Sequence, residues 1–226
     1  MEEVLKSLVE VGALAQEAGR YLLRKPLAEI DVPDTIQGVI MARIDRLAEA
    51  PRRALQLASV VGREFTVRLL ARIADMETPL EPPLQELKVL EFIYERSVYP
   101  ELAYMFKHAL THDVAYNSVL VQRRKVLHQV VAMAIEELYA ERLVEFYEML
   151  AYHYEQGERW AKALGYLMQA VQKAQQAYAN REALGYYDRA LAVREQPDVA
   201  VEPSTLMTLY AGKGAAHFLL SAFQPA

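Results

Sequence analysis

The sequence predicts a mainly α-helical protein in which a short β-hairpin separates two groups of helices. Its composition is rich in alanine, leucine, glutamate and arginine, which favour helices. Apolar residues recur at helical spacing through most of the chain, and two β-rich runs lie close together near residue 100. Toward the C-terminus, a pattern of large and small residues repeats, as in proteins built from stacked helical hairpins. We therefore expect two parts, of which only the first contains the β-hairpin.

Length, charge and cysteine content exclude several classes of protein. At 226 residues, the chain has room for one or two domains. Its formal charge of −5 argues against nucleic-acid binding, because such proteins usually present a basic face. The absence of cysteine excludes disulfides and thiolate metal sites. The sequence has no apolar run of about 18 residues and no secretion signal at its N-terminus, so we expect a cytoplasmic protein without a membrane partner.

The first part of the chain predicts a short helix followed by a hairpin. Apolar residues at helical spacing favour a helix over 2–11, which Gly12 ends. The runs 13–16 and 21–24 flank Gly19, and a glycine at that position suits a tight turn because it adopts positive φ without strain.

The next segment predicts several helices and then a β-hairpin. Asp34 and Gln37 form a capping-box pattern that opens one helix. Pro51 lies in the first turn of the next helix, and Gly62 ends it. The remaining elements are helices over 66–75 and 83–91 and β-strands over 92–95 and 103–106. After the first of these helices, the remaining three followed by a hairpin match the plan of a winged-helix domain.

The last part of the chain has the spacing of tetratricopeptide repeats, in which large residues of one helix pack on small residues of its neighbour. Tyr147 and Tyr154 occupy large positions of a first block, and Tyr210 restarts that block. The second block occurs twice in close succession, so we expect one helix to pack against two neighbouring helices. These second blocks consist of Ala163, Leu167 and Ala170, and of Ala183, Tyr187 and Ala190. The sequence ends inside a repeat, which predicts a fragment of a longer array.

The order of these elements resembles the C-terminal half of the signal-transduction ATPases with numerous domains. The stretches 32–39, 42–47 and 57–65 are similar to sequences of that family. In its bacterial branch, the ATPase often accompanies a class III adenylate or guanylate cyclase or a transcriptional regulator. The resemblance implies that residues 1–34 end the ATPase lid region, that 35–106 form the winged-helix domain with its lead-in helix, and that 107–226 form tetratricopeptide-like repeats.

The resemblance implies a regulatory and partner-binding arm that couples the nucleotide state of an upstream ATPase domain to a protein–protein interaction. This chain has no phosphate loop of its own. Its only Gly-Lys pair begins at Gly212, and Met207 stands where the motif needs its leading glycine. We therefore expect ATP or ADP with Mg²⁺ to bind in the upstream domain, and we expect neither a cofactor nor ATP hydrolysis in this chain alone.

Two other classes of function remain as alternatives. The first is a DNA-binding winged-helix transcriptional regulator, although Glu81, Glu86 and Glu91 on or beside the candidate recognition helix would repel phosphates. The second is an enzyme in its own right, but the sequence contains no recognisable set of catalytic residues.

His108 is the candidate nucleotide-binding residue. The segment 106–110 is similar to the Met-His-Asp motif of nucleotide-switch ATPases, whose histidine contacts the β-phosphate of ADP. Lys107 and Ala109 replace the methionine and the aspartate. The resemblance implies that His108 senses the phosphate in the full-length protein, since an imidazole N–H donates to a phosphate oxygen. The alternative is a surface or capping histidine at the start of a helix.

The same region raises the question of a metal site. His108 and His112 have the i, i+4 spacing of zinc ligands on a helix, with Asp113 and His128 as further candidates. Ala109, however, stands where a zinc protease needs its catalytic glutamate. Ordinary polar residues explain the pattern more simply, so no metal site is predicted.

A partner is expected on the first helix of a repeat, over about residues 143–156. Its residues outside the core positions are Glu145, Glu148, Tyr152 and Glu155. Three carboxylates around an aromatic ring would attract a basic protein or peptide segment and hold it by cation–π contact. The alternative is a solvated face whose acids keep the helix soluble.

Overall fold

The structure, a computed structural model, describes residues 14–17, 20–23, 36–74, 79–196 and 199–222. It divides the chain into two compact units, Met1–Val121 and Gln122–Ala226. The described residues are mainly helical, with a small three-stranded antiparallel sheet in the first unit, which confirms the predicted fold class at this level. The helix expected over 2–11 and the capping residue Asp34 lie outside the described residues.

The hairpin expected near the N-terminus is present. Strands β1 (Leu14–Glu17) and β2 (Arg20–Leu23) pair in antiparallel fashion, with Glu17 opposite Arg20. The pairing confirms the interpretation of the two extended runs around Gly19.

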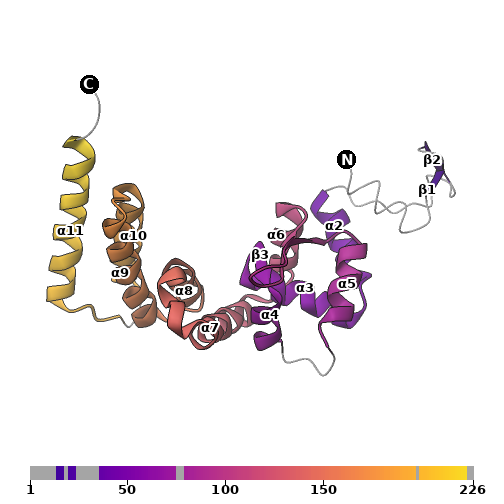
Figure 1. Cartoon of the computed structure of the whole chain (residues 1–226), viewed down its shortest axis with the longest axis horizontal. Helices are drawn as coiled ribbons and strands as arrows, with labels where there is room; N and C mark the ends of the chain where they lie inside the picture. Colours follow the sequence, from indigo (N-terminus) through magenta and orange to yellow (C-terminus); the bar gives the residue numbers. More distant parts are fainter. Residues whose placement is uncertain (1–13, 18–19, 24–35, 75–78, 197–198, 223–226) are drawn as a thin grey trace. The chain divides into compact units, whose positions relative to one another are not determined.

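The first unit contains a group of helices centred on α3. The helices are α2 (Ile36–Asp45), α3 (Glu49–Val61), α4 (Val67–Ile73), α5 (Glu81–Val89) and α6 (Ala109–Asn117). Helix α3 packs on α4, α5 and α6, and α2 packs on α6 (Figure 1). Every position of α3 from Leu57 to Val61 is buried, which an amphipathic surface helix would not show. Helix α3 is therefore the centre of this core.

The sheet of the first unit has one strand more than the sequence predicted. Strands β4 (Ile93–Ser97) and β5 (Ala103–Phe106) form the expected hairpin, and β3 (Glu64–Thr66) pairs with the other edge of β5 in antiparallel fashion. Gly62 ends α3 with φ 147°, a conformation that favours glycine, and the chain then enters β3. The side chain of Thr66 accepts a hydrogen bond from Leu69 N at 3.2 Å and so caps α4.

The boundary between the units lies after α6, whereas residue 106 was the predicted end of the first domain. Helix α6 packs on α2 and α3, so it belongs to the core of the first unit. The Nε2 of His112 on α6 lies 3.0 Å from the carbonyl oxygen of Ser59 on α3, which adds a polar contact to this packing.

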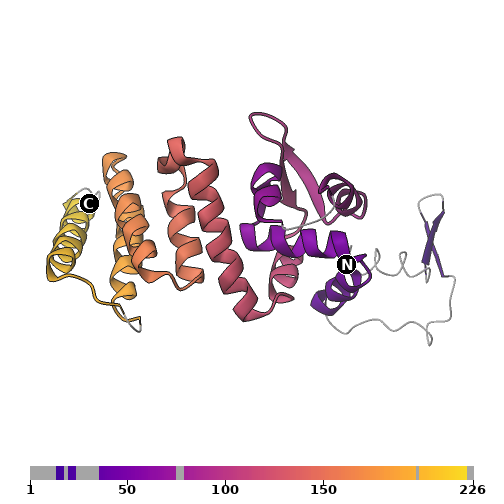
Figure 2. The same ribbon diagram turned by 90° about the horizontal axis from the view of Figure 1, so that it is seen from below.

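The second unit is a succession of helices. They are α7 (Val121–Leu138), the 3₁₀ helix η2 (Ala140–Glu145), α8 (Tyr147–Gln156), α9 (Trp160–Gln176), α10 (Asn180–Val193) and α11 (Pro203–Ala222). Helix α8 packs on α9, α9 on α10, and α10 on α11 (Figures 1 and 2). Helix α9 therefore contacts two neighbours, α8 and α10, as the close succession of the two second blocks predicted for one helix.

The residues of the two second blocks form the core of this array. All six of them are at most 4% exposed: Ala163, Leu167, Ala170, Ala183, Tyr187 and Ala190. Four are alanines, so the helix axes approach closely, and Leu167 and Tyr187 fill the space between them. The repeat spacing thus predicted the buried faces of α9 and α10.

The helix expected over about 143–156 is interrupted. Arg142 has non-helical φ and ψ of −130° and 24°, and Phe146 separates η2 from α8 with φ −116° and ψ 5°. The ring of Phe146 stacks on Tyr139 with a centroid distance of 4.4 Å, which holds the chain in this bend. Glu145 consequently lies on η2 and not on α8.

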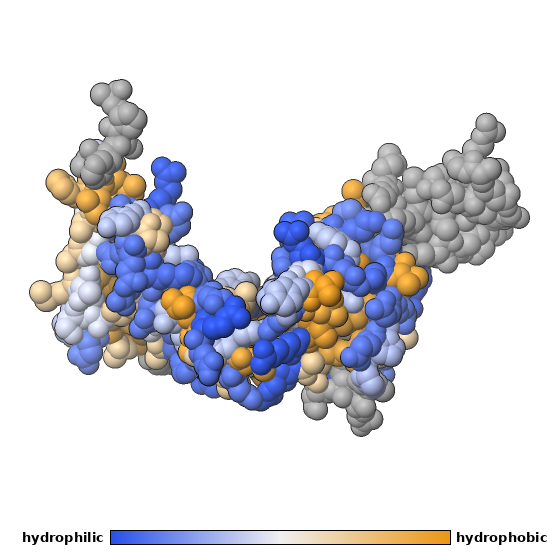
Figure 3. All heavy atoms as spheres, in the orientation of Figure 1, coloured by the Kyte–Doolittle hydropathy of each residue, from blue (hydrophilic) through white to orange (hydrophobic). Residues whose placement is uncertain are grey.

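Helix α11 presents an apolar surface to solvent. In Figure 3, orange and beige spheres lie over α11 at the left of the view. The exposed large side chains of this helix are Met207, Tyr210, Phe218 and Leu219. Leu209 and Ala216, in contrast, are buried in the core shared with α10. Among the residues that the structure describes, no helix combines the length and the apolar character needed to cross a membrane.

Candidate functional site

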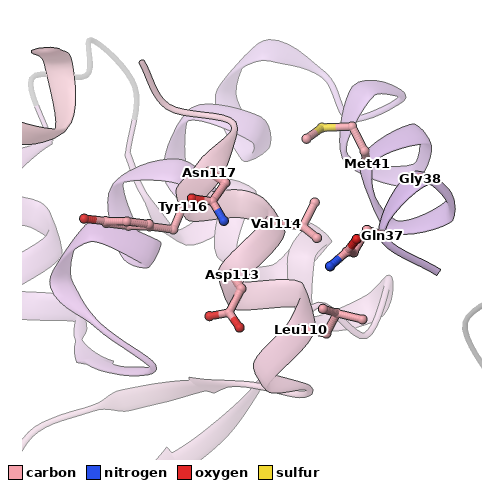
Figure 4. Close-up of a pocket in the computed structure, with 8 residues that line it drawn as sticks. All are labelled: Gln37, Gly38, Met41, Leu110, Asp113, Val114, Tyr116 and Asn117. Atoms are coloured by element: carbon pink, nitrogen blue, oxygen red, sulfur yellow. The ribbon is translucent and has the colours of Figure 1, made fainter. Parts of the chain in front are cut away.

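A pocket of about 570 Å³ lies between α2 and α6 in the first unit. Figure 4 shows Gln37 of α2 pointing toward Val114 and Leu110 of α6, while Tyr116 points away from α2. Its lining consists of Gln37, Gly38, Met41, Leu110, Asp113, Val114, Tyr116 and Asn117. The lining is mixed, with amide and carboxylate groups beside apolar side chains. The pocket lies beside α6, the helix that follows His108, which is the predicted phosphate sensor.

His108 is the residue immediately before α6. It is half-buried and occupies the N-cap position with φ −130° and ψ 140°, but its side chain makes no capping hydrogen bond. It does not belong to the lining of the pocket between α2 and α6. The structure therefore agrees with the predicted position at a helix start, and it does not assign the imidazole to a capping role.

His112 and Asp113 form a polar cluster on α6. The Nδ1 of His112 lies 3.0 Å from Oδ1 of Asp113, and its Nε2 lies 3.0 Å from the carbonyl oxygen of Ser59. The ring also packs edge-on against Phe106, with a centroid distance of 5.1 Å. Both ring nitrogens of His112 thus face oxygen atoms of the protein, and the side chain connects α6 to α3 through Ser59.

The described residues contain no cluster of three or more histidine, cysteine, aspartate or glutamate side chains suited to hold a metal ion. His128, which the sequence offered as a further ligand beside His108, instead contacts His153 within the second unit.

The charged side chains of α5 are two acids and one lysine. Glu81 and Glu86 are exposed, and the ammonium of Lys88 forms an ion pair with Glu95 of β4. This hydrogen bond to Glu95 raises the pKa of Lys88 above its ordinary value. The one cation of α5, Lys88, is thus paired with an acid, and the exposed acids of this helix would repel DNA phosphates.

The four residues predicted for partner binding lie on η2 and α8. The three acids among them each pair with a basic side chain of the same chain. Glu145 of η2 accepts a hydrogen bond from Arg142 Nε at 2.8 Å. Glu148 of α8 lies 2.8 Å from Lys173 Nζ of α9, and Glu155 of α8 pairs with Arg189 of α10. Each carboxylate thus has a cation within ion-pair distance, and the face is less negative than the sequence indicated.

Tyr152 is the exposed aromatic residue of this face. Its side chain is 43% exposed, and its ring packs edge-on against His128 and His153, with centroid distances of 5.7 Å and 5.4 Å. The ring of Tyr152 is therefore partly exposed and rests on two histidines. We use the name partner face below for Glu145, Glu148, Tyr152 and Glu155 together.

Ion pairs also join α7 to α9 and α10 to α11. Glu136 of α7 accepts hydrogen bonds from Lys162 Nζ at 2.8 Å and from the hydroxyl of Tyr166 at 2.6 Å. Burial alone would raise the pKa of Glu136, but these two donors hold it below its ordinary value. Asp188 of α10 pairs with Lys213 of α11 in the same way. These ion pairs therefore connect α7 with α9 and α10 with α11.

Two buried histidines are the feature that sequence analysis missed. His128 of α7 is 1% exposed and His153 of α8 is 0% exposed, and their Nδ1 atoms lie 2.8 Å apart. A signal was present in the sequence, because His128 shares the helical spacing of the buried residues Val131 and Ile135. Histidine is too ambiguous a residue for that spacing to have indicated burial by itself.

Comparison with known proteins does not place the chain in a family. No family model matches the sequence, and no curated protein matches it with significant similarity. The interpretation of function therefore depends on the geometry described above.

Proposed function

We propose that this chain is the regulatory and partner-binding arm of a multidomain signal-transduction ATPase. The observation that carries the proposal is the array in which α8, α9, α10 and α11 each pack on the next helix of the chain. Arrays of this kind leave a long surface free on each helix, and such surfaces bind proteins or peptides. The tetratricopeptide spacing of the buried residues of α9 and α10 supports this assignment.

In this proposal, the first unit is a winged-helix domain that contacts an upstream ATPase domain. The helices α3, α4 and α5 followed by the hairpin β4–β5 support the assignment, as does the position of His108 between β5 and α6. His108 would donate to a phosphate of ADP held in the upstream domain, so that the arm responds to the nucleotide state.

Replacement of His108 by alanine tests the nucleotide part of the proposal. In the full-length protein, we expect ADP affinity to fall about 10- to 100-fold, because a charge-assisted hydrogen bond of this kind contributes about 1.5–3 kcal/mol. Equilibrium titration with fluorescent ADP measures the change. His108→Asn retains an N–H donor and should recover part of the affinity, whereas His217→Ala on α11 is a control distant in the chain.

A structural role of His108 would give a different result. If His108→Ala lowers the melting temperature of the protein and leaves ADP affinity unchanged, the phosphate-sensor proposal is wrong. Unchanged ADP affinity with unchanged stability would equally contradict it.

The partner face is proposed to bind a basic segment through Tyr152 and the carboxylates around it. Because Glu148 already pairs with Lys173, a basic partner has to compete with that lysine. We expect Lys173→Ala to strengthen binding of a labelled arginine-rich peptide several-fold at low salt, and Glu148→Lys to weaken it by a similar factor. Fluorescence anisotropy at two salt concentrations measures both effects.

The control is Glu202→Lys, which changes the net charge equally at an exposed acid before α11. A non-specific attraction to the whole protein would respond to Glu202→Lys as strongly as to Glu148→Lys, and that result would count against the partner face. The paired exchange Glu148→Lys with Lys173→Glu keeps the net charge and separates loss of the ion pair from loss of the binding charge.

A further inference from the structure

The buried pair His128 and His153 lies at the contact between α7 and α8. A hydrogen bond between two Nδ1 atoms requires one nitrogen to donate and the other to accept. Two fully protonated rings would place two N–H donors against each other and would bury two charges. The contact is therefore compatible with neutral rings and is lost when both become imidazolium ions.

The groups around the pair do not favour its protonation. Arg124 lies one turn before His128 on α7, and its charge has the same sign as an imidazolium. Other charged and titratable groups on the packed elements already have partners. The ion pairs are Lys125 with Glu158 and Lys162 with Glu136, Arg159 Nε donates to Gln129, and Tyr166 donates to Glu136.

Burial, and secondarily the charge of Arg124, lowers the pKa of His128 to about 4. In the unfolded chain the pKa of a histidine is about 6.5, so the unfolded state binds more protons than the folded state between these values. The stability that the neutral His128 contributes is consequently present above about pH 6.5 and is lost as the pH falls toward 4. For this single group, the unfolding equilibrium constant rises about fortyfold between pH 6.5 and 4.5.

The pair is connected to the partner face and to the turn before α9. Tyr152 rests on both imidazoles, as described above. Gln129, the neighbour of His128, donates from its amide nitrogen to the carbonyl oxygen of Gly157 at 2.6 Å. A disturbance at the pair therefore reaches an exposed aromatic residue on one side and the α8–α9 turn on the other.

We propose that His128 and His153 form a pH-sensitive switch that holds α7 and α8 together at neutral pH and loosens the partner face on acidification. This inference rests on the proposed partner-binding function only for its effect on binding. The switch itself depends on the geometry of the two histidines.

The decisive measurement compares the wild-type chain with the double variant His128→Leu, His153→Leu. Leucine has a similar volume, and replacing both partners of a buried hydrogen bond by apolar groups is often well tolerated. Urea unfolding from pH 7.5 to 4.5 is followed by the fluorescence of Trp160, the only tryptophan of the chain, which lies in the second unit. The exposed residue His217 provides the matched control His217→Leu.

Between pH 6.5 and 4.5, we expect the folding equilibrium constant of the second unit to fall about fortyfold more in the wild-type protein and in His217→Leu than in the double variant. The same pH dependence in all three proteins would overturn the switch, because carboxylates alone would then explain it. If the double variant does not fold, an NMR titration of the wild-type imidazoles decides. A His128 that titrates near pH 6.5 in the folded protein contradicts the proposal, and one that stays neutral until the unit opens supports it.

The link to partner binding is measured with the arginine-rich peptide at pH 7.0 and pH 5.0. We expect the wild type to lose more affinity than the double variant over this range. An equal loss in both proteins would overturn the link. Absence of peptide binding at pH 7.0 would contradict the proposed partner face but would leave the pH dependence of unfolding as an independent result.

Discussion

Gly212→Ala is expected to destabilise the second unit by about 1–3 kcal/mol, because the new methyl group would enter occupied space. An alanine Cβ at this position would overlap the hydroxyl oxygen of Tyr187 and lie 2.5 Å from its Cζ. Tyr187 is 4% exposed and belongs to the core that joins α10 to α11, so its ring has little room to move. Urea unfolding followed by circular dichroism measures the loss.

The neighbouring glycine supplies a matched control. A Cβ at Gly214 meets nothing within 4 Å, although the residue lies in the same helix two positions later. Because alanine is a better helix former than glycine, Gly214→Ala should stabilise the protein by about 0.5–1 kcal/mol. Two substitutions of the same kind should therefore have opposite signs. If both stabilise the protein equally, the close packing of α11 on Tyr187 is wrong.

Arg43→Ala is expected to destabilise the first unit by about 2–4 kcal/mol, because Arg43 is a buried cation with specific partners. Its side chain is 3% exposed, and its Nη2 donates to the carbonyl oxygen of Leu90 at 2.9 Å. The guanidinium also lies over the ring of Phe92, with 4.7 Å between Cζ and the ring centroid. The substitution removes the donor, the cation–π contact and the packing volume together.

The controls for this prediction are Arg46→Ala and Arg43→Lys. Arg46 is exposed and directly follows the last residue of α2, and its replacement should change the free energy of unfolding by less than about 0.5 kcal/mol. Lysine at position 43 keeps the charge but lacks the planar group, so it should recover only part of the stability. A melting temperature for Arg43→Ala equal to that of Arg46→Ala would show that the buried guanidinium contributes nothing.

Local patterns predicted the elements whose cause is local. Gly62 ends α3, and the two β-rich runs form the hairpin β4–β5. Helix termination at glycine, helix periodicity and β-propensity act over a few residues, so one sequence is enough to detect them.

The predictions that were wrong or incomplete depended on distant partners. Strand β3 has three residues and no periodic signal of its own, and it exists because the free edge of β5 pairs with it. The bend around Phe146 depends on the stacking of its ring on Tyr139. Helix α6 belongs to the first unit because of its packing on α2 and α3.

The candidate sites show the same division. The sequence was sufficient to propose Glu148 and Glu155 as solvent-facing acids, but Lys173 and Arg189, which neutralise them, come from the next two helices. The burial of His128 against His153, and of Arg43 against Phe92, also requires residues that are distant in the chain.

The sequence by itself determined the helical class, the hairpin and the small-residue faces on which α9 and α10 pack, because periodicity and residue size express these features within one element. Only the tertiary structure decided which polar side chains are buried and which charges are neutralised. Burial and Coulomb energy depend on atoms within a few ångströms in space, and a position along the chain does not specify those neighbours.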